Sequence, residues 1–98
     1  MEPWKFYLDR LGERVGRMPS NLPGREDLIA EAAHDAYQST ANRLTSEGWD
    51  EEDALTVTRM FGQAVREWID NGSRDWDELA EHIRALYERW SAGKMVEE

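Results

Sequence analysis

The sequence predicts an all-α fold, a small four-helix bundle-like domain with a Pro/Gly loop after the first helix. Four segments repeat apolar residues at spacings of three and four, which is the period of an amphipathic helix. Residue types that start and end helices stand between these segments. No segment alternates β-branched and polar residues as a half-buried strand would. With 98 residues, the chain is long enough for one domain and no more.

The first helix is expected over residues 4–17, because an apolar stripe recurs there at helical spacing: Trp4, Leu8, Leu11, Val15 and Met18. Pro3 suits the first turn, where the N–H that proline lacks would be unpaired anyway. Gly12 and Gly16 lie beside the stripe and either let another backbone approach closely or make the helix short and marginal. Two prolines and a glycine in residues 18–24 end the helix and form a loop or hinge.

The second helix is expected over residues 25–47, with an apolar face rich in alanine that allows close packing: Leu28, Ile29, Ala32, Ala33, Ala36, Tyr37, Ala41 and Leu44. Glu26 and Asp27 lie in the first turn, where carboxylates favour the positive end of the helix dipole. Gly48 ends the helix, and Trp49 is expected to fold back onto its last turn.

The third helix is expected over residues 51–71. Asp50 is predicted to be its N-cap, and Asn71 with Gly72 gives a strong signal for its end. Its apolar residues cover more of the circumference than one seam, which indicates a central position in the bundle: Ala54, Leu55, Val57, Met60, Phe61, Ala64, Val65, Trp68 and Ile69.

The fourth helix is expected over residues 76–91, in an antiparallel hairpin with the third. Asp75 and Glu78 form a capping box at its start, because they stand three positions apart before an apolar stripe. Gly93 is expected to end the helix, which leaves residues 92–98 as a polar tail.

The charge of the chain is strongly negative. Twelve Lys and Arg residues stand against 21 Asp and Glu residues, which gives a formal charge of −9. A polyanion is repelled by nucleic-acid phosphates, so no direct nucleic-acid binding is expected. A helix-turn-helix reading of the last two helices fails for the same reason, because its recognition helix would present carboxylates to the major groove.

The basic residues are concentrated near the N-terminus. Residues 1–25 carry five basic and three acidic groups, a balance of +2, whereas residues 26–98 carry seven basic and 18 acidic groups, a balance of −11. The first helix is therefore attracted to the rest of the molecule. Because a proline-rich hinge follows it, this helix is also a candidate for exchange between two copies in a homodimer.

Several classes of function are excluded by what the sequence lacks. It contains no cysteine, which removes disulfides, cysteine-ligated zinc, iron–sulfur clusters and thiol nucleophiles. No apolar run reaches the roughly 18 residues that a bilayer span needs, and the first residues do not have the pattern of a signal peptide. We expect no membrane association and a cytoplasmic location, either in a bacterial cell or in a phage-infected host.

Neither a metal site nor a catalytic site is expected. Glu31 and His34 form a Glu-x-x-His pair of the kind used by carboxylate-bridged di-iron bundles, but His82 has no carboxylate three positions before it. Both histidines are therefore interpreted as surface residues beside acids. No serine stands in a nucleophile motif, and no glycine-rich phosphate loop is present. We expect no enzymatic activity, no cofactor and no metal.

Aromatic and acidic residues are the remaining candidates for function. Of the five tryptophans, Trp68 and Trp90 are in phase with apolar stripes and are expected in the core. The aromatic cluster in the first helix is too large for one face, so at least one member should lie outside the core. The residues predicted to bind a partner are this cluster and two acidic groups: Trp4, Phe6, Tyr7, Asp50, Glu51, Glu52, Asp53, Asp75, Asp77, Glu78 and Glu81.

The acidic groups have two interpretations. They keep a small protein soluble, or they imitate nucleic-acid phosphates and occupy a basic channel on another protein. We expect a small acidic protein-binding module, an inhibitor or regulator that occupies a basic surface of a partner protein. The alternative is a self-assembling module without enzymatic activity. In size and charge alone, the chain is similar to phage-encoded inhibitors of host defence such as anti-CRISPR proteins, which block nucleic-acid-handling machinery.

Overall fold

Four helices make up the fold, as the sequence predicts. The computed structural model describes residues 2–19, 21–72 and 75–96, and these include no strand. The helices are α1 (Pro3–Val15), α2 (Arg25–Ser46), α3 (Glu51–Asp70) and α4 (Trp76–Val96). Their starts and ends agree with the predicted ones to within two residues, except at the end of α4.

The predicted tail is wrong for residues 92–96, which continue α4 through Gly93. A glycine inside a helix costs about 1 kcal/mol relative to alanine, so the sequence alone favours an end at this point. The last turn is held to α3 by an ion pair between Lys94 Nζ and Asp53 Oδ1, at 3.0 Å. A tertiary contact of this kind offsets the poor helix propensity of glycine. Residues 97 and 98 lie outside the described residues.

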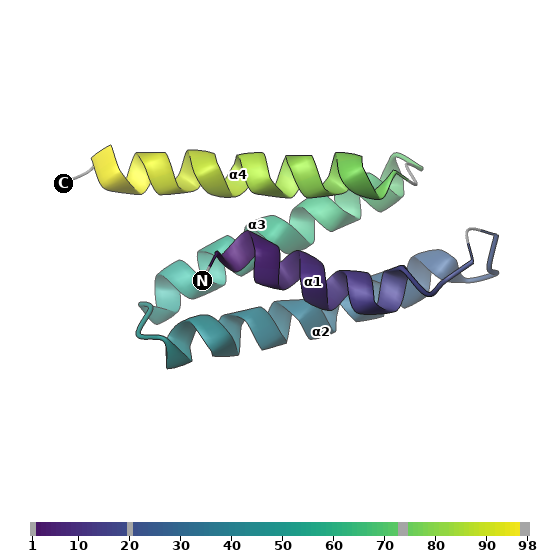
Figure 1. Cartoon of the computed structure of the whole chain (residues 1–98), viewed down its shortest axis with the longest axis horizontal. Helices are drawn as coiled ribbons and strands as arrows, with labels where there is room; N and C mark the ends of the chain where they lie inside the picture. Colours follow the sequence, from purple (N-terminus) through teal and green to yellow (C-terminus); the bar gives the residue numbers. More distant parts are fainter. Residues whose placement is uncertain (1, 20, 73–74, 97–98) are drawn as a thin grey trace.

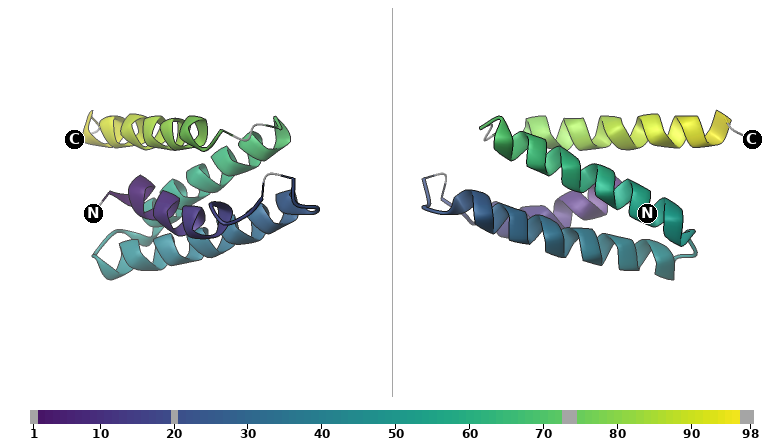
Figure 2. Two further views of the ribbon diagram at one scale, coloured as in Figure 1. Left: turned by 45° about the vertical axis from the view of Figure 1, so that its right-hand side comes forward. Right: turned by 180° about the vertical axis from the view of Figure 1, so that it is seen from behind.

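The helices are arranged around α3, which contacts the three others (Figure 1). α2 packs along one side of α3, α4 runs antiparallel along the other side, and α1 lies between α2 and α4 (Figures 1 and 2). Among the described residues, α2 and α4 do not touch each other. The predictions of a central third helix and of an antiparallel hairpin are both confirmed.

The molecule is long and thin. Its Cα positions extend over 47 × 23 × 18 Å, and packed helix axes lie 8–10 Å apart, so the shortest dimension holds about two helices. α1 covers one face of the α2–α3 pair, and no helix covers the opposite face in the described part of the chain (Figure 2, right). One side of the pair is therefore left open to solvent.

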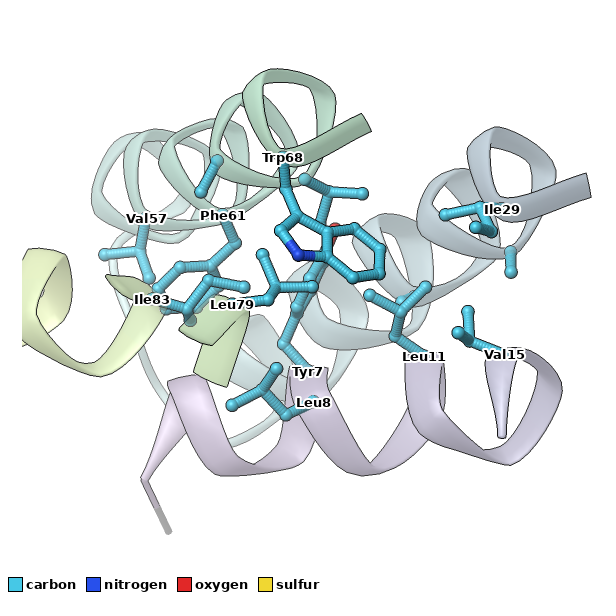
Figure 3. Close-up of a cluster of buried hydrophobic side chains, with 14 residues drawn as sticks. Tyr7, Leu8, Leu11, Val15, Ile29, Val57, Phe61, Trp68, Leu79 and Ile83 are labelled. Atoms are coloured by element: carbon cyan, nitrogen blue, oxygen red, sulfur yellow. The ribbon is translucent and has the colours of Figure 1, made fainter. Parts of the chain in front are cut away.

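The core lies where α1, α3 and α4 meet, and it extends between α1 and α2 (Figure 3). Tyr7 of α1 and Phe61 of α3 are fully buried, and their ring centroids are 5.2 Å apart with the planes tilted by 50°. This tilted geometry is the one that aromatic pairs prefer. Leu79 and Ile83 complete the contact from α4. The largest side chains of the core thus join three helices at one place.

The turn between α2 and α3 follows the predicted glycine-ended pattern. Gly48 has φ +96°, a left-handed conformation that glycine adopts without a steric cost. Its N–H donates to the carbonyl of Thr45 at 3.1 Å, and the N–H of Trp49 donates to the carbonyl of Leu44 at 3.0 Å. These two bonds define a Schellman motif. The prediction that Trp49 folds back onto the last turn of α2 is confirmed at the backbone.

Asp50 and Asp75 both precede their helices as predicted, but only the side chain of Asp75 accepts a capping hydrogen bond. Asp50 precedes α3, yet its side chain makes no capping hydrogen bond; its carbonyl accepts from the N–H of Ala54 at 2.9 Å. At α4, Asp75 Oδ1 accepts from the N–H of Asp77 at 3.1 Å, which is a cap on the second residue of the helix. The carbonyl of Asp75 also accepts a bond from Trp68 Nε1 at 3.2 Å, so this cap is tied to α3.

Gly12 admits a close neighbour, as predicted, but the neighbour is a side chain and not a backbone. A Cβ at this position would stand 3.3 Å from the indole of Trp76, closer than most real Cβ contacts. The same indole meets Trp68 edge to face, with centroids 6.5 Å apart. Gly12 therefore lets the first residue of α4 pack onto α1 and close this end of the bundle.

Two hydroxyl groups are buried without a partner in the described part of the chain: Tyr7 OH and Thr40 Oγ1. Thr40 is fully buried although the sequence stripe of α2 does not include it, because it lies one turn after the buried Ala36. Burial raises the pKa of Tyr7 far above its ordinary value, since the ionised phenolate would lose its hydration. The Tyr7 hydroxyl thus makes no hydrogen bond within the described residues that would offset the free-energy cost of burying it.

Replacing Tyr7 by phenylalanine tests this arrangement. At neutral pH, we expect Tyr7→Phe to leave the free energy of unfolding unchanged or to raise it by up to about 1 kcal/mol, because an unpaired buried hydroxyl is removed. The raised pKa means that the wild type loses stability as pH rises above 10, since only the unfolded chain ionises easily. Tyr7→Phe should lack that component of the loss.

Urea unfolding at pH 7 and at about pH 11 measures both effects. Tyr37→Phe, at a half-buried tyrosine of α2, is the matched control and should keep the alkaline loss of the wild type. A fall of more than about 1 kcal/mol for Tyr7→Phe at pH 7 would show that the hydroxyl does have a bonding partner.

Candidate functional site

The aromatic cluster of α1 divides between the core and the surface. Tyr7 has no exposed surface, so the prediction that it binds a partner is wrong: its ring is needed against Phe61. Trp4 is half-buried and packs against the core. Phe6 is half-buried, lies outside the core cluster, and has the guanidinium of Arg43 6.0 Å from its ring centroid. The expectation that one of the three lies outside the core is confirmed by Phe6.

The two predicted acidic groups are not brought together. Asp50 to Asp53 stand at the start of α3, and Asp75 to Glu81 stand at the start of α4. Because the two helices run antiparallel, these starts are separated by the length of α3, about 30 Å for 20 residues. The acidic groups therefore form two separate surfaces, and a single partner site does not include both.

At the first of these surfaces, two indoles stack. The rings of Trp49 and Trp90 have centroids 5.8 Å apart and planes inclined by 17°. Both tryptophans are half-buried and packed against the core, and Trp90 packs there as its phase with the apolar stripe predicts. We call this surface the aromatic end, defined by Trp49, Trp90 and the three carboxylates that follow in sequence: Asp50, Glu51 and Glu52.

A series of rings connects the aromatic end to the core. Trp90 is 6.0 Å from Tyr87, and Tyr87 is 6.4 Å from the buried Phe61, measured between ring centroids. The pKa of Tyr87 is raised by burial and by the negative charge of Glu2, while a hydrogen bond with Ser91 acts in the opposite direction. Glu2 therefore adds to the negative potential at this end, and the indoles are fixed by packing before any partner arrives.

The carboxylates of the aromatic end are available. Asp50, Glu51 and Glu52 are exposed and make no ion pair within the described residues, whereas Asp53 is half-buried and paired with Lys94. An indole with carboxylates beside it binds cationic groups, because the ring face attracts a cation and the carboxylates neutralise it. The arrangement is chemically suited to a lysine or arginine side chain.

A second concave feature, which we call the α2–α3 groove, lies between α2 and α3. Seen from behind, these two helices lie in front of α1 (Figure 2, right). The groove has a volume of about 600 Å³. Its apolar lining comes from both helices: Ala30, Ala33, Tyr37, Gly62, Val65 and Ile69.

Charged residues surround the groove. Glu26 and Asp27 at the start of α2 and Asp70 at the end of α3 lie at one end, because the helices are antiparallel. Arg66 and His34 also line the groove, and the rings of His34 and Tyr37 are nearly parallel, with centroids 6.5 Å apart. The apolar pattern of the sequence does not predict this groove. Gly62, in the middle of the apolar stripe of α3, is the one signal in the sequence that points to it.

The two histidines lie on helices that do not pack against each other and so cannot share one site. His34 is on α2 and His82 is on α4, helices that do not touch. His82 Nε2 lies 3.9 Å from Glu67 Oε2. In the described part of the chain, no group of three or more His, Asp or Glu residues could hold a metal ion. None of the described helices combines the length and the apolar composition that crossing a membrane would require.

The chain gives no significant match to a family model, to a curated protein or to a solved structure. The chemistry of the aromatic end and of the α2–α3 groove is therefore what indicates a function.

The stacked indole pair predicts a specific spectroscopic result. Trp49→Phe and Trp90→Phe should remove the same exciton contribution from the circular dichroism spectrum, because each indole needs the other at 5.8 Å. The double variant should then lose no more of this contribution than either single variant. Trp4→Phe is the control, since no ring contact of Trp4 with another tryptophan is present among the described residues. Persistence of the exciton contribution in either single variant would contradict the stacking.

Proposed function

We propose that this protein is a binding module that occupies a basic surface of another protein, with the aromatic end as the contact. The observation that carries the proposal is the stacked pair Trp49–Trp90 beside three exposed carboxylates without ion-pair partners in the described residues. Tryptophan is the residue type most enriched at binding hot spots. Carboxylates around it select a cationic partner and steer the approach of that partner.

Two physical reasons favour binding at this end over the start of α4. Rigid aromatic side chains lose little conformational entropy on binding, and the ring series from Phe61 holds both indoles in place. The indole at the start of α4, Trp76, is instead packed over Gly12 and against Trp68. The carboxylates at the start of α4 thus have no stacked pair of open indoles beside them.

The consequence for a partner depends on what its basic surface does. A surface that binds nucleic acid would be blocked by competition, and the protein would then act as an inhibitor of nucleic-acid-handling machinery, as phage-encoded anti-CRISPR proteins do. Occupation of any other basic surface would make it a regulator. In both cases the binding should weaken as salt rises, because exposed charges are screened.

A pair of matched charge reversals tests the proposal. Glu51→Lys/Glu52→Lys at the aromatic end should reduce the affinity for the captured partner about tenfold or more, because two attractions become repulsions. Asp77→Lys/Glu81→Lys changes the net charge equally at the other acidic surface and should keep wild-type affinity. The partner is captured from the native host, or from the cell that it infects, and each variant is titrated against it.

The opposite pattern, with loss only for Asp77→Lys/Glu81→Lys, would contradict the proposal. Light scattering on the wild type distinguishes this proposal from the alternative of a self-assembling module, because self-assembly predicts a mass above the 11.4 kDa of one chain. Circular dichroism and urea unfolding confirm that both double variants are folded. Each reversal lies in or near a first helical turn, where a lysine costs about 0.3–1 kcal/mol through the helix dipole. Glu81→Lys also removes the exposed ion pair of Glu81 with Arg84, so urea unfolding has to be compared for both variants.

A further inference from the structure

We propose that the α2–α3 groove is a second docking site, which takes one amphipathic basic helix from another protein. This inference goes beyond the aromatic end. The two sites use different residues, and the acidic end of the groove lies at the opposite end of α2 and α3 from the turn that contains Trp49.

Gly62 is the first argument. It stands in the interior of α3, where glycine costs about 1 kcal/mol relative to alanine. Nothing in the described part of the chain requires it, since a Cβ built at this position meets no atom within 4 Å. This is unlike Gly12, where Trp76 fills the space. The missing side chain at Gly62 therefore leaves room for something outside the chain that comes close to the α3 backbone.

The shape of the groove fits a helix. The apolar residues of α2 run from Ala30 to Tyr37, and those of α3 run from Gly62 to Ile69. Each run covers eight positions along its helix, and its seven steps span about 10 Å or two helical turns. A helix that lies in such a groove presents apolar residues at spacings of three and four, which is a common mode of peptide recognition. Small residues on both walls allow its backbone to approach.

Charge identifies the occupant. The groove is lined by three carboxylates, Glu26, Asp27 and Asp70, against one guanidinium, Arg66, which leaves −2 with His34 neutral. None of these groups makes an ion pair within the described residues. A lysine or arginine at the end of a docked helix would meet the carboxylates. A second copy of the chain is disfavoured, because each copy carries a charge of −9.

Synthetic peptides provide the probe. The test peptide is an amphipathic helix with alanine and leucine on one face and lysine at one end; its controls are a scrambled peptide of the same composition and a version with glutamate in place of lysine. Binding is followed by calorimetry and by amide chemical shifts of the ¹⁵N-labelled full chain. We expect the test peptide to bind with the largest shifts at Ala30, Ala33 and Val65, and both control peptides to bind at least tenfold more weakly.

Two variants locate the binding. Gly62→Leu fills the groove and should weaken the peptide at least tenfold while keeping the fold, because a Cβ at this position meets no atom within 4 Å. Gln63→Leu adds a similar apolar side chain at the next, exposed position of α3, which does not line the groove, and should bind as the wild type does. Urea unfolding should show that Gly62→Leu is at least as stable as the wild type.

Three outcomes would overturn the inference: no binding of the test peptide at about 1 mM, equal binding to Gly62→Leu and the wild type, or a wild-type dimer that Gly62→Leu dissociates, which would make a second copy the occupant. Glu51→Lys/Glu52→Lys, tested with the same peptide, should bind normally. The proposal for the groove and the proposal for the aromatic end can therefore be disproved independently of each other.

Discussion

The packing of α3 against the three other helices, with the buried pair of Tyr7 in α1 and Phe61 in α3 at its centre, is the constraint on which the rest of the structure depends. α2 and α4 do not pack against each other in the described part of the chain, whereas α3 and α1 each pack against both of them. Tyr7 and Phe61 lie at this junction with no exposed surface. The ring series through Tyr87 to Trp90 begins there, and so does the packing of Leu79 and Ile83.

The open surfaces are consequences of the same arrangement. α1 lies on one face of the α2–α3 pair, and residues of α2 and α3 leave a groove between the two helices. Because α4 packs on α3 without reaching α2, its C-terminal half meets the turn after α2 through Trp90 and Trp49 alone among the aromatic residues described. A molecule about two helices deep has little interior to enclose a ligand, which favours function through surfaces.

Local signals in the sequence predict most of the fold. The helices follow from the period of apolar residues, and the turn at Gly48 follows from a residue type that adopts positive φ without cost. The features that could not be predicted depend on contacts between distant residues. The end of α4 is one, since Lys94 reaches Asp53 on another helix. The burial of Tyr7 is another, because three aromatics compete for one helix face and the sequence does not show which faces Phe61.

The candidate site was predictable only in part, for the same reason. Asp50, Glu51 and Glu52 follow from composition, but their association with a stacked indole pair requires the antiparallel path of α4. The groove combines half-exposed positions of two helices, and no single segment carries its pattern.

Native-state hydrogen exchange tests the central role of the α1–α3 contact most directly. If α1 belongs to the cooperative core, the amides of residues 7–12 should exchange with the same opening free energy as those of residues 57–65 in α3, and both should match the global free energy of unfolding. If residues 7–12 instead exchange through a much smaller opening while α3 stays protected, α1 is a detachable element and the Tyr7–Phe61 pair is not at the centre of the cooperative core.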